Sequence, residues 1–491
     1  MQQASPPLVE TADVAAVNAK ASRSLYADRP RIHPKRARGN FRRIKWIVMA
    51  LTLGVYYGVP WLRWDRGPYL PDQAVLIDIP NRRFFFFFIE IWPQEFYFVA
   101  GLLILAALCL FLMTSIAGRV WCGYTCPQTV WTDLMIAVER WVEGDRAKRI
   151  QLDRAPMNAD KLRKRITKHA AWLLIAMLTG GAWVFYFGDA PTLAIDLVSG
   201  TAPYVAYTTV AILTASTYLL GGLAREQVCT YMCPWPRIQG AMIDDQSLMV
   251  SYRAWRGDPR GHHRKGDSWD DRGDCIDCKQ CVVVCPMGID IRDGAQLECI
   301  NCALCIDACN EVMAKIERPA NLIAYDSFQG LEAAGHGDAR PRLVRPRTII
   351  YAALIGLVSV AMLAALLLRS DFDMSIQRDR NPLFVRLSDG SIRNGYTVHV
   401  LNKTYGETRF SLVVQGLPGA TLSILGQAGA GIHLVPDDLT RIRAFITVPA
   451  AVAKSAARQN GTALPIKIAA ERADGSLAVR SATTFRLPEE K

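Results

Sequence analysis

Two runs of four cysteines constrain this chain more than any other feature. They read CIDCKQCVVVC and CINCALCIDAC, and both have the spacing CxxCxxCxxxC. Three cysteines at intervals of three hold one iron–sulfur cube in a short loop, and the fourth reaches the other cube in two-cluster ferredoxins. The spacing therefore predicts two [4Fe–4S] clusters. Their predicted ligands are Cys275, Cys278, Cys281 and Cys309 for the first cluster, and Cys299, Cys302, Cys305 and Cys285 for the second.

Other uses of such cysteines fit the pattern less well. A zinc ribbon needs two CxxC pairs rather than two runs of four, and a disulfide knot is typical of secreted chains. Pro286 follows the first run, whereas Asn310 follows the second. That difference changes one turn and removes no thiol, so the two-cluster interpretation stands.

Five apolar windows predict membrane-spanning helices. Hydrophobic residues make up 51% of the 491 residues although 21% are charged, so the hydrophobicity must be concentrated in segments. Each window is about 20 residues long, the length that crosses about 30 Å of hydrocarbon at about 1.5 Å per residue. The windows are residues 44–62, 96–118, 170–188, 203–223 and 349–368.

The positions of Lys and Arg predict how these spans are oriented. Ten lie between Lys20 and Lys45, and eleven lie between Arg119 and Lys168. By the positive-inside rule, these segments are cytoplasmic in a bacterial inner membrane. The N-terminus and the ferredoxin segment are then cytoplasmic, and the part after residue 368 is periplasmic. The net charge of +12 reflects this topology and contact with anionic membrane lipid, and no basic patch interleaved with aromatic residues indicates nucleic acid.

Two further cysteine pairs have the spacing CxxxC followed by proline. Cys122 and Cys126 follow the second window, and Cys229 and Cys233 follow the fourth. Residues i and i+4 share one helical face with Cβ atoms about 5 to 6 Å apart, which suits a shared metal better than a relaxed disulfide. A proline after each pair would end or kink the helix. We therefore predict that two helical hairpins bring these four thiols together at the membrane surface.

Four thiolates form a soft ligand set that prefers Cu(I), zinc or iron–sulfur clusters. For one pair alone, inert buried cysteine would be the simpler interpretation, but two copies with the same spacing favour a functional site. Cys109, in the middle of the second window, is predicted to be a packing residue. None of the 13 cysteines lies in a segment predicted to be external, which keeps the thiols in a reducing compartment.

The part after the fifth window has a β pattern. Short alternating runs are separated by turn residues such as Asn460-Gly461 and Asp474-Gly475. This pattern of short strands and turns predicts an immunoglobulin-like β-sandwich. The expected fold class is thus a polytopic α-helical membrane protein with an inserted 2[4Fe–4S] ferredoxin domain and a C-terminal all-β sandwich.

The predicted domain boundaries follow from these patterns. Residues 1–43 form a disordered basic tail, 44–223 a four-helix membrane region, 224–268 a linker, 269–320 the ferredoxin domain, 321–348 a second linker, 349–368 the fifth span and 369–491 the sandwich.

Together these features resemble the cytochrome c oxidase accessory protein family (CcoG, also called FixG or RdxA). The resemblance covers nearly the whole chain, including WPQEFYF (Trp92–Phe98), both CxxxCP motifs, CIDACNEVM (Cys305–Met313) and RDRNPLF (Arg378–Phe384). It implies a cupric reductase that delivers Cu(I) for the copper site of a cbb3-type oxidase. It also implies copper as a further metal, oxidase subunits or assembly factors and copper carriers as partners, and a cytoplasmic electron donor. We expect the copper or redox site at Cys122, Cys126, Cys229 and Cys233.

Two other functions are compatible with the same motifs. Paired CxxxCP motifs with a ferredoxin segment also occur in membrane quinol dehydrogenases of periplasmic nitrate reduction and in the regulator of nitrous oxide reductase. The chain would then carry electrons between quinol and the clusters. Alternatively, it would be a non-catalytic scaffold for oxidase assembly.

Overall fold

A computed structural model describes residues 12, 14, 31–67, 70–264, 266–333, 342–404, 408–426, 431–435, 438–472 and 475–488. It divides the chain into two compact units. The first comprises residues 1–64 and 73–362, and the second comprises residues 65–72 and 363–491. The first unit contains all 13 cysteines, so it is the unit that concerns the clusters.

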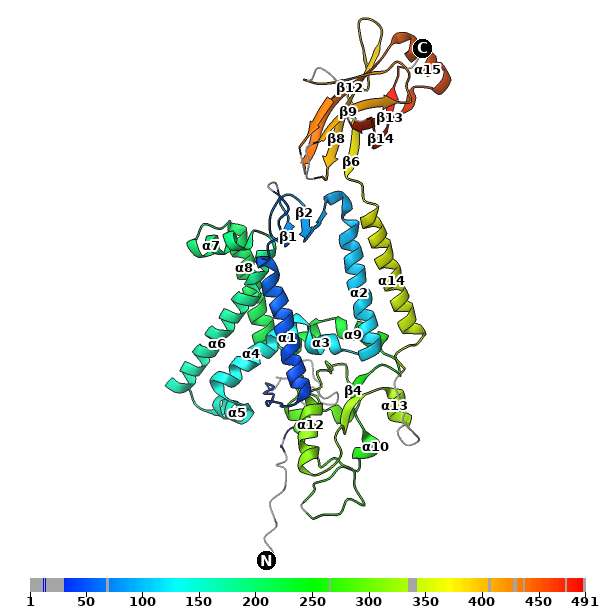
Figure 1. Cartoon of the computed structure of the whole chain (residues 1–491). Coiled ribbons are helices and arrows are strands. Elements are labelled where there is room, and N and C mark those ends of the chain that lie inside the picture. Colours follow the sequence, from blue (N-terminus) through cyan, green and yellow to red (C-terminus); the bar gives the residue numbers. More distant parts are fainter. Residues whose placement is uncertain are drawn as a thin grey trace, which may run out of the picture. The chain divides into compact units, whose positions relative to one another are not determined.

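Long apolar helices dominate the first unit (Figure 1). Within the described ranges, four are long and apolar enough to cross a membrane: Pro93–Ala117, Ala159–Tyr186, Tyr204–Ala224 and Pro346–Leu367. They correspond to four of the five predicted windows. The remaining window, 44–62, overlaps α1 (Asn40–Gly58), which is not among the four. The first turns of α1 carry Arg42, Arg43 and Lys45, which shorten its apolar stretch.

Besides α1, this unit contains further α-helices, both long and short, and two small sheets. The helices are α2 (Tyr97–Ala117), α3 (Val120–Tyr124), α4 (Pro127–Glu143), α5 (Arg146–Arg154), α6 (Ala159–Thr179), α7 (Ala190–Ser199), α8 (Tyr204–Thr217), α9 (Trp235–Met242), α10 (Ala254–Gly257), α11 (Gln280–Val283), α12 (Leu304–Lys315), α13 (Phe328–Ala333) and α14 (Pro346–Leu367). Strands β1 (Val75–Asp78), β2 (Arg83–Phe86) and β3 (Ile89–Ile91) form an antiparallel sheet.

The prediction of a disordered tail over residues 1–43 is wrong for its last part. Residues 31–43 have a defined path, and Ile32, His33 and Ala37 are buried; residues 1–30, except Ala12 and Val14, lie outside the described part. The Asp307 carboxylate accepts hydrogen bonds from the backbone N–H groups of Phe41 (3.2 Å) and Arg42 (2.8 Å). A carboxylate at a helix N-terminus satisfies free donors and complements the helix dipole. This contact fixes the start of α1 on the ferredoxin region.

The ferredoxin region is larger than the predicted segment 269–320. Strand β4 (Met249–Tyr252) lies in the predicted linker and pairs antiparallel with β5 (Ile323–Asp326). Both strands pack against the cysteine loops, with Val250, Tyr252 and Ile323 in the same buried cluster as Cys275 and Cys281. The flanking segments thus complete the domain because they supply its hydrophobic core.

The second unit contains the predicted all-β sandwich. One sheet has the order β10-β12-β8-β6, with β7 paired to β8, and the other has the order β11-β9-β13-β14. The strands are β6 (Phe372–Arg378), β7 (Val385–Arg386), β8 (Ile392–Asn402), β9 (Thr408–Gln415), β10 (Thr421–Ile424), β11 (Gly431–Leu434), β12 (Asp438–Val448), β13 (Ala463–Arg472) and β14 (Leu477–Arg486). Every pairing in these two sheets is antiparallel.

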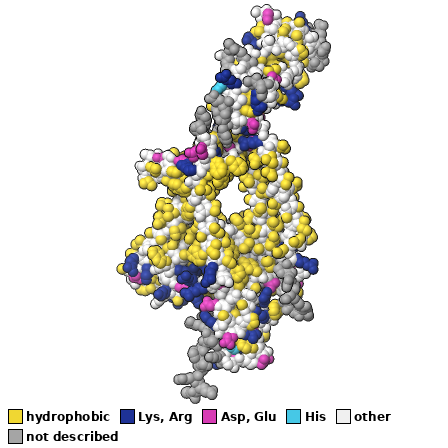
Figure 2. Space-filling model, in the orientation of Figure 1, with side chains coloured by type: hydrophobic (Ala, Val, Ile, Leu, Met, Phe, Trp, Pro, Cys, Tyr) yellow, Lys and Arg dark blue, Asp and Glu magenta, His cyan; other side chains and the backbone are white. Residues whose placement is uncertain are grey.

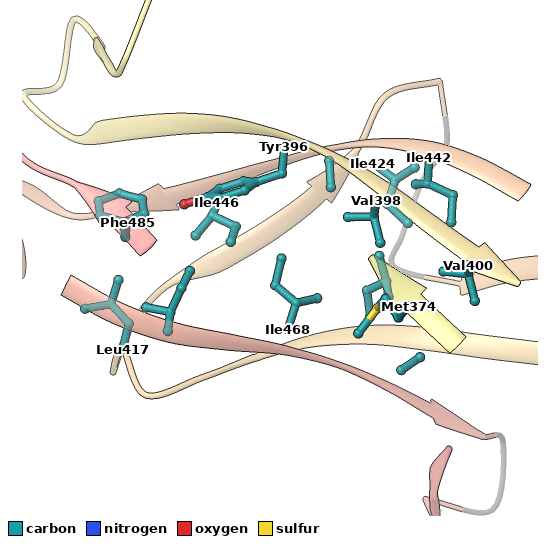
Figure 3. Close-up of a cluster of buried hydrophobic side chains, with 14 of the residues drawn as sticks. Met374, Tyr396, Val398, Val400, Leu417, Ile424, Ile442, Ile446, Ile468 and Phe485 are labelled. Atoms are coloured by element: carbon teal, nitrogen blue, oxygen red, sulfur yellow. The ribbon is translucent and has the colours of Figure 1, made fainter. Parts of the chain in front are cut away.

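Side chains from both sheets meet in the sandwich core (Figure 3). Tyr396 and Ile446 from one sheet face Ile468 and Phe485 from the other, and all four are fully buried. The Tyr396 hydroxyl donates a hydrogen bond to the carbonyl of Thr484 (2.9 Å), which ties β8 to β14. The alternating pattern predicted this core. It did not reveal the helix α15 (Ala450–Asn460), whose alanine-rich sequence favours a helix.

Candidate iron–sulfur and thiol site

The eight ferredoxin cysteines surround two small cavities. Cys275, Cys278, Cys281 and Cys309 line one cavity. Cys285, Cys299, Cys302 and Cys305 line the other, to which Cys281 also contributes. Each cavity thus brings together one of the ligand sets that the spacing predicts, including the fourth cysteine from the opposite run.

The backbone has the same unusual conformation in both loops. Asp277 and Asn301, each just before a second cysteine, have φ angles of 50° and 51°. Lys279 and Ala303, each just after it, have φ angles of 55° and 59°. Residues other than glycine rarely adopt positive φ, and they do so mainly where the surrounding structure requires it. The repeat indicates that both loops curve around their cavities in the same way.

The thiol groups are buried but receive backbone hydrogen bonds. Burial raises the pKa of Cys285 to about 12 and that of Cys299 to about 11. Hydrogen bonds from the backbone N–H groups of Ile289 and Met287 lower the pKa of Cys285. A hydrogen bond from the backbone N–H of Asn301 lowers the pKa of Cys299 in the same way. The positive charge of bound iron is therefore needed to stabilise a thiolate at these buried positions. Hydrogen bonds from backbone N–H groups to cysteine sulfur are a feature of iron–sulfur cluster sites. The donor set fits a [4Fe–4S] cluster in each cavity.

Arg292 is the nearest fixed cation to the first set of cysteines. Its Nη1 lies 3.9 Å from the Cys275 Sγ, and its side chain is held by Asp290 (2.7 Å) and Asp277 (2.5 Å). Hydrogen bonds that the Arg292 guanidinium donates to the Asp290 carboxylate are the main reason that the pKa of Arg292 is raised. A positive charge at this position favours the more negative, reduced form of a cluster.

We predict that Arg292→Gln lowers the reduction potential of the first cluster. A unit charge about 7 Å from the cluster stabilises the added electron by about 2 kcal/mol at an effective dielectric constant of about 20. For one electron this energy corresponds to a shift of about 100 mV in the reduction potential, and the two aspartates reduce the shift. A redox titration followed by electron paramagnetic resonance measures the change. The second cluster is the internal control, and equal potentials in wild type and variant would contradict the prediction.

The two CxxxCP motifs do not have the uniform helical geometry that the sequence predicted. Cys122 lies in α3, but Cys126 lies beyond the end of that helix, with ψ 127°. Cys229 lies in a π-helical turn, η6 (Val228–Met232), and Cys233 follows it with ψ 123°. The residue before a proline avoids the α region because of steric conflict with the proline ring. Regular helix is therefore interrupted around the second cysteine of each motif, and a new helix starts at Pro127 in the first motif and at Trp235 in the second.

Cys122 and Cys229, one thiol from each motif, nevertheless pack in the same group of side chains. Burial raises the pKa of Cys229 to about 12 and also raises the pKa of Cys122. The packing brings one cysteine of each motif into one group, and a joint site of all four thiols stays a prediction.

Gln239 on α9 connects the two motifs. Its amide is fully buried, and its Oε1 accepts hydrogen bonds from the Cys122 Sγ (3.3 Å) and from the Arg119 Nε (3.2 Å). Its Nε2 donates to the Thr114 hydroxyl at the end of α2 (3.3 Å). No sequence pattern points to Gln239, because its partners precede it by more than 110 residues. It positions the first motif against the helix that follows the second.

The first motif packs directly on the loop of the second cluster. Cys122 and Cys229 belong to the same buried group of side chains as Cys302. The Tyr124 hydroxyl donates to the Cys302 carbonyl (3.3 Å). A Cβ atom at Gly123 would lie 2.6 Å from the Ile300 carbonyl oxygen, so only glycine permits this approach. The CxxxCP thiols are thus neighbours of the second cluster site.

Among the described residues, no three His, Cys, Asp or Glu side chains are arranged to hold a single metal ion. This applies to the four CxxxCP thiols and also to the eight ferredoxin cysteines.

Three family models match the chain. A 4Fe-4S dicluster domain matches residues 224–328, which include all eight ferredoxin cysteines and the second CxxxCP motif. A 4Fe-4S binding domain matches residues 99–145, which include the first CxxxCP motif. The IG-like fold at the C-terminus of FixG matches residues 362–488. The chain therefore has 4Fe–4S domains and the predicted C-terminal sandwich.

Curated relatives are similar over nearly the full length. The chain is 52% identical to nitrogen fixation protein FixG of Rhizobium meliloti, over 89% of this chain and 90% of the relative. It is 56% identical to protein RdxB of Cereibacter sphaeroides, over 86% and 90%, and 54% identical to protein RdxA of the same organism, over 87% and 91%. A solved FixG-related protein of Vibrio parahaemolyticus aligns with 24% of this chain and 98% of its own, with 19% identity and a TM-score of 0.20.

Proposed function

Because this chain belongs to the family of FixG, RdxA and RdxB, we propose that it is a membrane-bound oxidoreductase that reduces Cu(II) to Cu(I) for assembly of a cbb3-type cytochrome c oxidase. The observation that carries the proposal is the packing of Cys122 and Cys229 in one buried group with the cysteines of the second cluster site. The clusters, when bound, supply one-electron storage and transfer. Each Cu(II) ion takes up one electron and leaves as Cu(I).

The four CxxxCP cysteines bind the substrate in this proposal. Thiolates favour Cu(I) over Cu(II), so a site that binds through sulfur stabilises the reduced product. An ion that must leave again is served better by an incomplete ligand set than by a closed cage. Gln239 and Arg119 hold Cys122 in position, and Thr129 fixes the loop through a hydrogen bond to the Cys122 carbonyl (2.6 Å).

The remaining features of the proposal concern the membrane and the partners. The basic loops support an orientation with the N-terminus and the ferredoxin region in the cytoplasm and the sandwich in the periplasm. A cytoplasmic reductant would then supply the electrons, and a copper carrier or an oxidase assembly factor would receive Cu(I). The sandwich would provide a surface for oxidase subunits.

Copper reduction by single-cysteine variants tests this proposal. The holoprotein is reduced without oxygen and given stoichiometric Cu(II), while cluster absorbance and a Cu(I)-specific chelator are followed together. We expect Cys122→Ala, Cys126→Ala, Cys229→Ala and Cys233→Ala to retain both clusters but to form Cu(I) more than about tenfold more slowly, since thiolate ligation of the product is lost.

Cys109→Ala is the matched control. Cys109 is an exposed thiol on α2, away from both motifs, and its removal should leave the rate unchanged. Wild-type rates in all four CxxxCP variants would refute the assignment of the copper site to these cysteines.

An apolar cavity beside Cys126 favours the quinol conduit as a second candidate. It has a volume of about 330 Å³ and includes Thr125 and Pro127, which flank Cys126. Tyr56, Trp131 and Trp183 supply aromatic surface from α1, α4 and the end of the third apolar stretch. A flat lipophilic ring would fit such a lining. Reoxidation of the clusters by a short-chain quinone in cysteine variants that no longer reduce copper would favour this candidate.

A further inference from the structure

A second, strongly basic cavity lies between the N-terminal segment and α4. Its volume is about 600 Å³. Five arginines line it, namely Arg36, Arg38, Arg42, Arg43 and Arg140, and no carboxylate does. Neither the copper proposal nor the quinol candidate uses this cavity. Five guanidinium groups around one space repel each other, so the cavity has a charge that favours an anion.

Two carboxylates lie near the cavity, and one of them neutralises the lining residue Arg42. Asp133 binds the Arg42 guanidinium (2.8 Å), and Asp145 accepts the backbone N–H groups of Arg36 (3.2 Å) and Arg146 (2.8 Å). The Arg140 Nη2 donates to the Pro34 carbonyl (3.2 Å). The Arg140 Nε is buried and has no hydrogen-bond partner among the described residues. Burial, together with the charge of Arg42, lowers the pKa of Arg140 to about 10, although Asp133 and Asp145 act in the opposite direction.

The surroundings of the cavity are those of a membrane interface. Trp46 and Trp141 line it with 40% and 79% of their surface exposed, and the Arg42 guanidinium lies 4.5 Å from the centre of the Trp46 ring. Further along α1, Leu51 and Val55 are exposed apolar residues. Figure 2 shows Lys and Arg side chains gathered near the lower end of α1, where a broad hydrophobic surface ends. Tryptophan and arginine together are typical of the headgroup region.

We propose that this cavity binds the headgroup phosphate of an anionic phospholipid from the surrounding bilayer. Arg36, Arg38 and Arg43 are exposed and donate to the phosphate oxygens, for which the planar guanidinium is well suited. Trp46 and Trp141 contact the glycerol and the upper acyl chains. Basic pockets beside membrane helices are a known form of headgroup site, and the apolar rim selects a lipid over a free anion.

Bound lipid would fasten residues 36–43 to α4. The same segment continues into the N-terminus of α1, which Asp307 caps. A phospholipid in this cavity therefore stabilises the docking of the ferredoxin region at the membrane surface. This role is independent of which substrate the clusters reduce.

Native mass spectrometry of the detergent-solubilised holoprotein tests the proposal. The probes are a short-chain phosphatidylglycerol, the matching phosphatidylcholine and inorganic phosphate. We expect one phosphatidylglycerol to bind at a much lower lipid concentration than phosphatidylcholine does. In the variant Arg36→Gln/Arg38→Gln/Arg43→Gln we expect roughly 100-fold weaker binding, because each basic residue contributes about fivefold.

The variant Lys148→Gln/Arg154→Gln/Arg163→Gln is the matched control. It removes three positive charges from exposed positions on α5 and α6, outside the cavity, and should bind phosphatidylglycerol like wild type. Equal losses in both triple variants would mean a general charge effect and would overturn the site. Equal binding of phosphatidylcholine, or displacement of the lipid by inorganic phosphate at the same concentration, would overturn the choice of an anionic lipid.

Discussion

Replacement of Gly123 by alanine should slow Cu(I) formation by the reduced protein about 100-fold, a loss typical of a small displacement between reacting groups. The added Cβ would lie 2.6 Å from the Ile300 carbonyl oxygen and 3.0 Å from the Cys302 Cα. Both are backbone atoms, so no side-chain rotation can relieve the contact. The first CxxxCP motif must move away from the loop of the second cluster, and the path for the electron becomes longer.

The measurement is the anaerobic Cu(II) assay, together with iron and sulfide analysis. Gly123→Ala should retain both clusters, because Gly123 is not a ligand. Gly54→Ala is the control, since a Cβ at Gly54 on α1 meets nothing within 4 Å. A wild-type rate in Gly123→Ala would show that the close contact between motif and loop is not needed for reduction.

The second large effect is expected from Glu139→Gln. Glu139 is fully buried on α4, and its carboxylate pairs with Arg149, with Arg225 and with Arg31 (3.4 Å). The Lys168 Nζ lies 3.8 Å away, and the Lys168 and Arg149 side chains are also fully buried. Removing one partner of a buried ion pair leaves charge uncompensated and typically costs about 3 to 5 kcal/mol. The N-terminal segment, α5 and α6 should therefore loosen together.

Thermal unfolding in detergent measures this effect, and the midpoint should fall on the order of 10 °C. Burial favours the protonated acid, but Arg225, Arg149 and Arg31 outweigh it and hold the pKa of Glu139 below its ordinary value. The wild type should therefore lose this stabilisation only as the pH falls below about 4.5. Glu139→Gln should lack it at every pH.

Glu311→Gln is the control for the loss of a carboxylate. Glu311 forms an exposed i,i+4 pair with Lys315, and such pairs contribute little. The midpoint of thermal unfolding of Glu311→Gln should match that of wild type. Equal midpoints for Glu139→Gln and Glu311→Gln would contradict the importance of the buried ion network.

The sequence predicted features that depend on local spacing. The intervals within the two cysteine runs are enough to divide eight cysteines into two sets, and the fold gathers each set around one cavity. Likewise, apolar length identified α2, α6, α8 and α14, and alternation identified most strands of the sandwich. These signals are carried by residues close together in the chain.

Features that depend on distant partners could not be predicted in this way. Residues 31–43 look disordered by composition, and they are ordered because distant residues, among them Asp133, Asp145 and Asp307, hold them. The i,i+4 rule assumed regular helix at both CxxxC pairs, whereas pre-proline geometry at Cys126 and a π-turn at Cys229 determine the actual path. The helix α15 was hidden because strand alternation on either side dominated the pattern.

The cap that Asp307 provides for α1 has a consequence for biogenesis. Asp307 lies on α12 between Cys305 and Cys309, which line different cluster cavities. The helix that presents this carboxylate is therefore held in place from both sides only when iron has been inserted. A chain made during iron starvation should leave its N-terminal segment undocked and open to proteolysis. Cleavage of this segment should therefore distinguish protein without clusters from the matured protein.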